Sequence, residues 1–143
     1  MTSSSSTYKE WRYTDNGDGT VTDNATNLMW VKNANTVGAP MAWTFASSYA
    51  ASLDYAGHTD WRLGKTTPNE LNTLGWYNGI YDGTWEGLSF SPFTGLYSWY
   101  YWSGTDIDES NAYSVYLAGG GYAGDVKAES KNAGNYVWCC RDA

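Results

Sequence analysis

Residues 15–30 read DNGDGTVTDNATNLMW, and they decide how the fold begins. The pairs Asn16-Gly17 and Asp18-Gly19 supply residues that adopt positive φ angles, which tight hairpin turns require. We therefore expect a β-hairpin whose second strand covers residues 20–22. A second turn over residues 23–27 leads into LMWVK at residues 28–32, whose bulky side chains favour another strand. The acidic turn lacks the alternating ligands and distal glutamate of a helix-loop-helix calcium site, so a plain hairpin is the better interpretation.

The segment before this hairpin is polar. Its first residues, MTSSSST, contain neither the basic segment nor the apolar segment of a secretion signal. We expect residues 1–10 to form a disordered tail, as chain ends often do. Residues 11–143 have the usual length of one domain, and we expect a single domain there. For display on a virion or on a cell surface, either a signal has been removed, or the protein leaves the cell by another route, such as inside a virion.

A helix is expected after the hairpin, over residues 40–53. Pro40 opens it, and proline is pre-organised for the first turn of a helix. The residues that would form its buried side recur at helical spacing and are Trp43, Ala46, Ala50 and Leu53. Gly57 follows and can stop the helix.

A second, shorter helix is expected from a capping-box pattern. Thr67 precedes Glu70 by three residues, and the residue after Thr67 is a proline. In a capping box, the threonine and glutamate side chains satisfy free backbone N–H groups at a helix start. The helix would direct Leu71 and Leu74 inward and end at Gly75.

The composition changes from Trp76 onward. Residues 76–126 contain six acidic residues, no basic residue and fourteen of the twenty-five aromatic residues. Strands are expected at residues 100–103, 113–117 and 136–139, with Gly, Ser, Asn and Asp between them. Together with the two helices, these strands indicate an α+β domain with a loop-rich C-terminal half.

Charge and apolar patterning exclude several functions. The net charge is −7, and the eight Lys and Arg residues are scattered along the chain. Nucleic-acid binding needs clustered basic residues that neutralise phosphates, so no nucleic-acid partner is expected. No apolar run approaches the ~20 residues that a membrane-spanning helix needs. The nine Trp and thirteen Tyr against three Phe favour surfaces that are half buried and half in contact with a partner.

Catalytic patterns are missing from the sequence, and we expect neither an enzyme nor a cofactor. His58 is the only histidine, which excludes sites built from several histidines. We expect it in a turn, and a cysteine nucleophile paired with His58 is the alternative. The sequence contains no nucleophile elbow, phosphate-binding loop or dinucleotide fingerprint. Cys139 and Cys140 are adjacent and have no third cysteine to pair with. We expect two reduced thiols, and a strained vicinal disulfide is the alternative.

An acidic cluster lies at Asp106, Asp108 and Glu109. Calcium prefers several carboxylate oxygens, so these residues are calcium candidates. Asn111 is the only other obvious ligand nearby, and a solvated loop is therefore the preferred interpretation. No metal is expected.

The aromatic residues of the C-terminal half admit two interpretations. Tyr and Trp give rigid contact area, and Ser, Gly and Asn give adaptable hydrogen bonds, which is the mixture found in antibody combining loops. Aromatic rings also stack on sugars. Part of the set must form the core, and we expect Tyr101, Trp102, Val115 and Leu117 there. Tyr100, Tyr116 and Tyr122 lie among polar residues and glycines, and we expect them to be exposed.

Four strings together resemble the Lcl C-terminal-domain family: DNGDGTVTDNATNLMW, DWRL followed by PNEL, YWSGT, and YVWCCR. The resemblance covers essentially the whole chain. It implies a C-type lectin-like fold, with two helices flanking a small, mainly antiparallel sheet, and ligand binding by the C-terminal half. The chain departs from the family at residues 64–66, which lengthen a loop. It also lacks the first-helix cysteine that could pair with Cys139, so the family's disulfide does not carry over.

Domains of this fold also serve as variable proteins of diversity-generating retroelements, including viral ones, and the C-terminal composition resembles theirs. This resemblance implies binding of a protein ligand through a displayed set, namely Tyr100, Asp106, Asp108, Asn111, Tyr113, Tyr116, Tyr122, Asp125 and Trp138. One alternative is a glycan-binding adhesin module. Another is an enzyme similar to the formylglycine-generating group, which would use Cys139 or Cys140.

Overall fold

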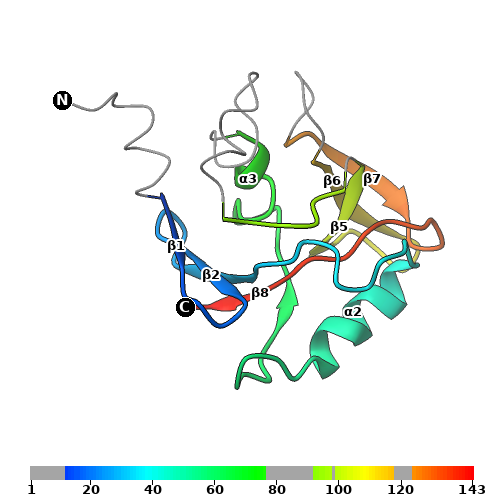
Figure 1. The fold of residues 1–143 in the computed structure, drawn as a ribbon. Helices are drawn as coiled ribbons and strands as arrows, with labels where there is room; N and C mark the ends of the chain where they lie inside the picture. Colours follow the sequence, from blue (N-terminus) through cyan, green and yellow to red (C-terminus); the bar gives the residue numbers. More distant parts are fainter. Residues whose placement is uncertain (1–11, 77–91, 98, 118–123) are drawn as a thin grey trace.

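The computed structural model describes residues 12–76, 92–97, 99–117 and 124–143 (Figure 1). These residues form an α+β fold with two antiparallel sheets, one α-helix and one further helical turn. The α+β class is as expected, but the strands form two sheets rather than one. The expected tail at residues 1–10 lies outside the described residues.

The first sheet has five strands in the order β1-β2-β3-β8-β4, and the second has three in the order β5-β6-β7. The element bounds are β1 Tyr13–Asp15, β2 Thr20–Asp23, β3 Leu28–Val31, α2 Trp43–Ser52, β4 Arg62–Leu63, α3 Thr73–Trp76, β5 Tyr100–Asp106, β6 Asn111–Tyr116, β7 Val126–Ser130 and β8 Cys139–Asp142. Figure 1 shows the β1-β2 hairpin and the C-terminus on one side of the molecule and the β5-β6-β7 sheet on the other.

The two expected turns of the first sheet are confirmed. β1 and β2 pair with Asp15 opposite Val21, and the backbone N–H of Asn16 donates to the Thr20 carbonyl at 3.0 Å. Gly19 has a φ of +90°, which favours glycine, and a Cβ atom at this position would collide with the Tyr55 hydroxyl. The second turn leads from β2 into β3, as the sequence predicts.

The helix α2 begins later than the sequence predicts. Residues before it pair with the C-terminal segment instead: the N–H of Met41 donates to the Asn135 carbonyl at 2.9 Å, and the N–H of Trp43 donates to the Lys131 carbonyl at 2.9 Å. Pro40 therefore lies outside the first helical turn. Ala46 and Ala50 are buried, which confirms the side of the helix that faces the core.

The predicted capping box is wrong. Residues 66–72 form turns, and only the single turn of α3 is helical. The Glu70 carboxylate accepts hydrogen bonds from the Arg62 guanidinium at 2.8 and 3.0 Å and from the Lys65 N–H at 2.8 Å. Because its oxygens hold the strand β4 and the following loop, they are not available to cap a helix at Thr67. Leu71 is fully buried, as expected, and so is Leu74.

The predicted strand at residues 136–139 is displaced toward the C-terminus. β8 begins at Cys139, where it can pair with Leu63 on one side, and it pairs with β3 on the other. Tyr136 makes only an isolated bridge to Tyr101 in the second sheet. The segment before β8 therefore crosses between the sheets, and its side chains fill the space that the crossing leaves.

The second sheet confirms the strands expected at residues 100–103 and 113–117. β7 was not expected: its sequence VKAES alternates apolar and polar residues over only four positions, and its side chains are mostly exposed. The four core residues expected from this half are all fully buried: Tyr101, Trp102, Val115 and Leu117. No helix in the described part of the chain is both long and apolar enough to cross a membrane.

Candidate functional site

A hollow of about 340 Å³ opens at one end of the β5-β6-β7 sheet, lined by Trp99, Tyr100, Tyr116 and Asp125. We call it the Asp125 hollow. Tyr100 is the first residue of β5 and lies opposite Tyr116, the last residue of β6. The N–H of Tyr116 donates to the Asp125 carbonyl at 2.9 Å, which fixes the start of β7 beside them. The sheet register thus brings together three residues of the expected displayed set.

The three rings among the described lining residues of the Asp125 hollow are steeply inclined to one another. The Tyr100 and Tyr116 centroids are 4.9 Å apart with an interplanar angle of 51°. Trp99 meets Tyr100 at 5.6 Å and 88°, and it meets Tyr116 at 6.5 Å and 70°. Edge-to-face arrangements of this kind are favoured by the ring quadrupoles. The rings therefore form a recess with walls in different directions rather than a flat platform.

Trp99 is the member of this hollow that the sequence reasoning missed. Its side chain is 48% exposed, although large apolar side chains usually avoid such exposure. The run WYYW at residues 99–102 does indicate that some of its rings are exposed. Successive residues of a strand point to opposite faces, so four consecutive aromatic residues cannot all enter one core.

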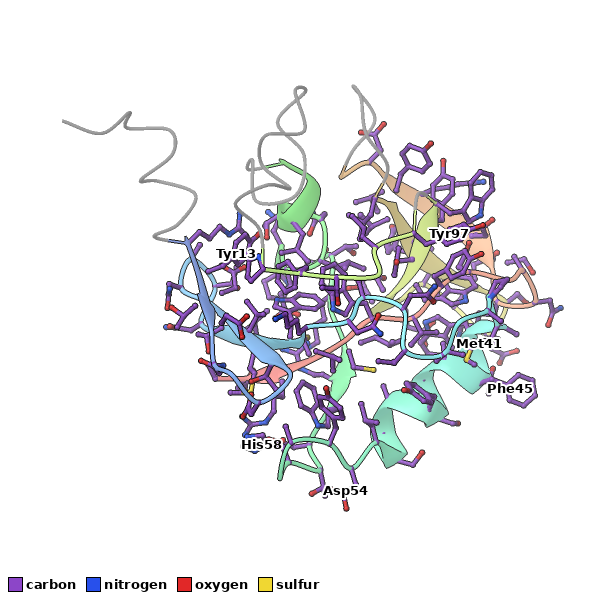
Figure 2. All side chains as sticks on the ribbon, viewed as in Figure 1. Tyr13, Met41, Phe45, Asp54, His58 and Tyr97 are labelled. Carbon is purple, nitrogen blue, oxygen red and sulfur yellow. The ribbon has the colours of Figure 1, made fainter. Side chains whose placement is uncertain are left out.

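A second hollow of about 320 Å³ adjoins the first and shares Trp99 with it. Its other lining residues are Pro40, Tyr97, Gly134 and Tyr136. The Tyr97 and Tyr136 rings are stacked, with centroids 4.4 Å apart and an interplanar angle of 23°. Figure 2 shows Tyr97 on the side of the molecule that the β5-β6-β7 sheet occupies. We call the combined surface the aromatic face, defined by Tyr97, Trp99, Tyr100, Tyr116, Asp125 and Tyr136.

Asp125 and Lys127 bring charge to the aromatic face. The Asp125 side chain is exposed and, within the residues that the structure describes, makes no ion pair. The Lys127 ammonium lies 4.9 Å from the Tyr100 ring centroid and 3.5 Å from the Glu129 Oε1 atom. Lys127 is not among the described residues that line the Asp125 hollow. The electron-rich face of Tyr100 therefore already attracts one cation from within the chain.

Three other residues of the expected set lie at the opposite end of the same strands. The Asp106 carboxylate pairs with the Lys131 ammonium at 2.7 Å. The Asp108 carboxylate accepts hydrogen bonds from the backbone N–H groups of Ser110 and Asn111, both at 2.8 Å. The Ser110 N–H does most to lower the pKa of Asp108, and the Asn111 side-chain amide adds to this. These contacts order the β5-β6 turn, and they separate Asp106, Asp108 and Asn111 from the aromatic face.

The calcium candidates do not converge. The structure contains no group of three or more His, Cys, Asp or Glu side chains arranged to hold a metal ion, as far as the described residues extend. Asp106 faces Lys131, and Asp108 accepts hydrogen bonds within its own turn. Glu109 is exposed in the same turn.

The remaining members of the expected set have different surroundings. Tyr113 is half-buried in the middle of β6, and Tyr122 lies outside the described residues. Trp138 is only 1% exposed, so the expectation that it is displayed is wrong. Its ring packs against Trp30 at 5.1 Å and Phe93 at 4.8 Å, and its indole N–H donates to the Val31 carbonyl at 2.7 Å. Its ring also lies 6.0 Å from that of Tyr101 in β5, so Trp138 contacts both sheets.

The two cysteines are buried, free thiols in β8. Burial raises the pKa of Cys139 from 9.0 to about 12, and burial also raises the pKa of Cys140. A thiol acts as a nucleophile only as the thiolate, which these surroundings disfavour near neutral pH. His58 forms a tight backbone turn with Tyr55, as expected, and its ring lies 6.2 Å from that of Trp61.

A third recess, of about 220 Å³, lies between α2 and β4. Its lining includes Trp43, Trp61, Arg62 and Lys65. The Arg62 guanidinium is already bound by Glu70 and lies 3.3 Å from Asp142, and the Trp61 indole N–H donates to the Tyr55 and His58 carbonyls. Because these polar groups have partners within the fold, this recess is a weaker candidate than the aromatic face.

The comparison with known families matches residues 19–141 to the Lcl C-terminal domain. A search of the curated proteins finds no match to the chain. The matched segment begins in the first hairpin, ends in β8 and includes every residue of the aromatic face. Since it spans most of the 143 residues, the chain belongs to the Lcl C-terminal domain family.

Proposed function

We propose that this protein is a non-enzymatic recognition domain that binds a protein ligand through its aromatic face. The observation that supports this most is the Asp125 hollow, where Trp99, Tyr100 and Tyr116 remain accessible at the paired ends of β5 and β6. Interface residues that contribute most to binding energy are enriched in Trp and Tyr, and they lie in well-packed recesses. Paired strands also hold the rings in place before binding, which reduces the entropy lost on association.

The proposal includes a C-type lectin-like fold and a role like that of the variable proteins of diversity-generating retroelements. Asp106, Asp108 and Asp125 are exposed, and Tyr100, Asn111, Tyr113 and Tyr116 are half-buried. Side chains in such positions can change without disturbing the core, as a diversified ligand-binding surface requires. In this proposal the domain is displayed on a virion or a cell surface. A near-copy of the 3′ end of the gene that differs at adenines, beside a reverse transcriptase gene, would support it.

Glycan binding is the second candidate, because aromatic rings also stack on sugars. A sugar ring is bound best by an aromatic platform that presents its face, whereas the rings of the Asp125 hollow meet at 51°, 70° and 88°. Sulfated polymers are disfavoured further by the net charge of −7, since like charges repel. An enzyme that uses Cys139 or Cys140 is disfavoured by the burial of both thiols.

The test is a binding screen with matched variants. The wild-type protein and the Tyr100→Ala/Tyr116→Ala variant are applied to an array of extracellular proteins and to a glycan array. Phe45→Ala is the control, because Phe45 is 69% exposed on α2, away from the aromatic face (Figure 2). We expect a protein hit that the double variant loses and the control retains. Hits only on neutral sugars, or protein hits that all variants retain, would refute the proposal.

A further inference from the structure

The shape of the Asp125 hollow suits a small head group rather than an extended flat ring. The rings of Trp99, Tyr100 and Tyr116 are inclined to one another by at least 51° and lie within 6.5 Å of one another. A flat ring entering this recess can stack on only one of them. A compact head group, by contrast, can lie close to more than one aromatic ring at once.

The charges around the hollow favour a cation. Asp125 is the only charged group among its described lining residues, and no ion pair within the described part of the chain neutralises it. The chain as a whole has a net charge of −7. Aromatic faces attract ammonium and guanidinium groups through their quadrupoles, and a neighbouring carboxylate adds direct attraction.

Lys127 shows that a cation can lie beside the rings of the hollow. Its ammonium lies 4.9 Å from the centroid of Tyr100, and its side chain is 52% exposed. Lys127 also has Glu129 as a partner at 3.5 Å. An ammonium group therefore already lies over one of the rings that line the hollow. It belongs to a half-exposed side chain, which a ligand could displace.

We infer that the Asp125 hollow binds a lysine or arginine side chain presented by the protein ligand. Trp99, Tyr100 and Tyr116 surround the cationic head group, and the Asp125 carboxylate pairs with it. This inference rests on the proposed function, because it identifies which part of the ligand enters the aromatic face. Lys127 opposes the incoming cation by charge repulsion and by competing for the Tyr100 ring.

The test is a titration of the ¹⁵N-labelled protein, followed by NMR at the indole N–H of Trp99, which is assigned with a Trp99→Phe variant. The probes are the Nα-acetyl, N-methylamide derivatives of lysine and arginine, with the norleucine derivative as the uncharged match. We expect a cationic derivative to bind about tenfold more tightly than the norleucine derivative, as a cation–π contact of moderate strength implies. Equal or tighter binding of the norleucine derivative would overturn the inference, as would the absence of binding by both cations.

Two charge variants distinguish a cation site from a general apolar recess. Asp125→Asn should weaken binding of the cationic probe by about two- to fivefold, which is typical of an exposed ion pair. Lys127→Met should strengthen binding by a similar factor, about two- to fivefold, because it removes a like charge and a competitor. A gain in affinity cannot arise from damage to the fold. Unchanged or weaker binding by Lys127→Met would contradict the inference.

The outcome for this site and the outcome for the proposed function can be separated. If the cationic probes fail while the protein ligand is still lost by Tyr100→Ala/Tyr116→Ala, the cation site is wrong and the proposed function stands. If the protein ligand binds that variant normally, the proposed function falls whatever the probes do. A shift of the Trp99 signal by methyl glucoside, without a response to the cations, would reject the cation site in favour of sugar recognition.

Discussion

Tyr100 and Tyr101 are adjacent in β5 but have opposite surroundings: Tyr100 lines the Asp125 hollow, whereas Tyr101 is fully buried against Tyr136 and Trp138. This contrast gives a matched pair of variants. Tyr101→Ala should lower the free energy of unfolding by about 3–5 kcal/mol, as for other large aromatic residues removed from a core. Tyr100→Ala should cost only about 1 kcal/mol, because it loses one cross-strand aromatic pair.

Urea unfolding of both variants, monitored by circular dichroism, measures this difference. Similar losses of unfolding free energy for the two variants would mean that Tyr100 is a core residue. The aromatic face would then have to be defined by Tyr97 and Trp99 instead. Tyr116→Ala provides the second half of the test, since it removes the opposite member of the cross-strand pair. It should resemble Tyr100→Ala.

A buried ion pair stabilises the first sheet. The Arg12 guanidinium donates to both carboxylate oxygens of Asp23, at 2.9 and 2.8 Å, and to the Thr73 hydroxyl at 2.9 Å. Both charged side chains are almost completely buried. Removing one partner leaves the other charge uncompensated, so Asp23→Ala should destabilise the fold by about 3–5 kcal/mol. The check is chemical denaturation at pH 7, and a loss below 1 kcal/mol would show that water reaches this pair.

The role of Glu70 can be separated from helix capping. Thr67→Ala should change stability by less than about 0.5 kcal/mol, because an exposed side chain without a capping bond contributes little. Glu70→Ala should cost about 2 kcal/mol, since it removes the bonds to Arg62 and to the Lys65 N–H. Thermal unfolding of both variants decides between the interpretations. A true capping box would give a loss of about 1 kcal/mol for Thr67→Ala.

The buried thiols predict a pH dependence of stability. The folded protein holds the protons of Cys139 and Cys140 more tightly than the unfolded chain does, because burial raises the pKa of Cys139 from 9.0 to about 12 and that of Cys140 in the same direction. This contribution is complete below about pH 9, where the thiols are protonated in both states. It is lost as pH rises from about 9 toward 12, because the unfolded chain releases its protons first.

Cysteine-free protein isolates this effect from the titration of the tyrosines. The stability of the wild type should fall more steeply between pH 8 and 10, which brackets about one unit each side of the usual thiol pKa, than that of Cys139→Ala/Cys140→Ala. At pH 8, a thiol reagent should label neither cysteine in the folded protein and both after unfolding. Rapid labelling of the folded protein would contradict the burial and would reopen the question of a cysteine nucleophile.

The local signals in the sequence predicted much of the fold. The Asn-Gly and Asp-Gly pairs marked the first hairpin, and the spacing of Ala46 and Ala50 marked the buried side of α2. The helix start was predicted too early, because long-range pairing of Met41 with Asn135 overrides the local preference of Pro40 for a first turn. Such pairing joins residues distant in the chain, so local patterns do not reveal it.

The candidate site was predicted in part, and the failures have a physical cause. Composition identifies a segment rich in Tyr and Trp but does not tell which rings face outward. Trp138 and Trp99 have the same side chain, yet contacts with both sheets bury the first, and its position at the sheet end exposes the second. Asp106 and Asp125 were expected in one displayed set because they share a residue type. In the structure they lie at opposite ends of the β5-β6-β7 sheet, separated by the length of its strands.

Ligand binding through the aromatic face can be observed at the indole signals of the protein. A protein ligand found on the array is added to the ¹⁵N-labelled protein, and the resolved indole N–H signals are compared. Binding through the aromatic face should shift or broaden the Trp99 signal at once, while the signals of the buried indoles of Trp102 and Trp138 keep their positions. A ligand that shifts the signals of Trp43 and Trp61 and leaves Trp99 unchanged would place the binding site in the recess beside α2 and not on the aromatic face.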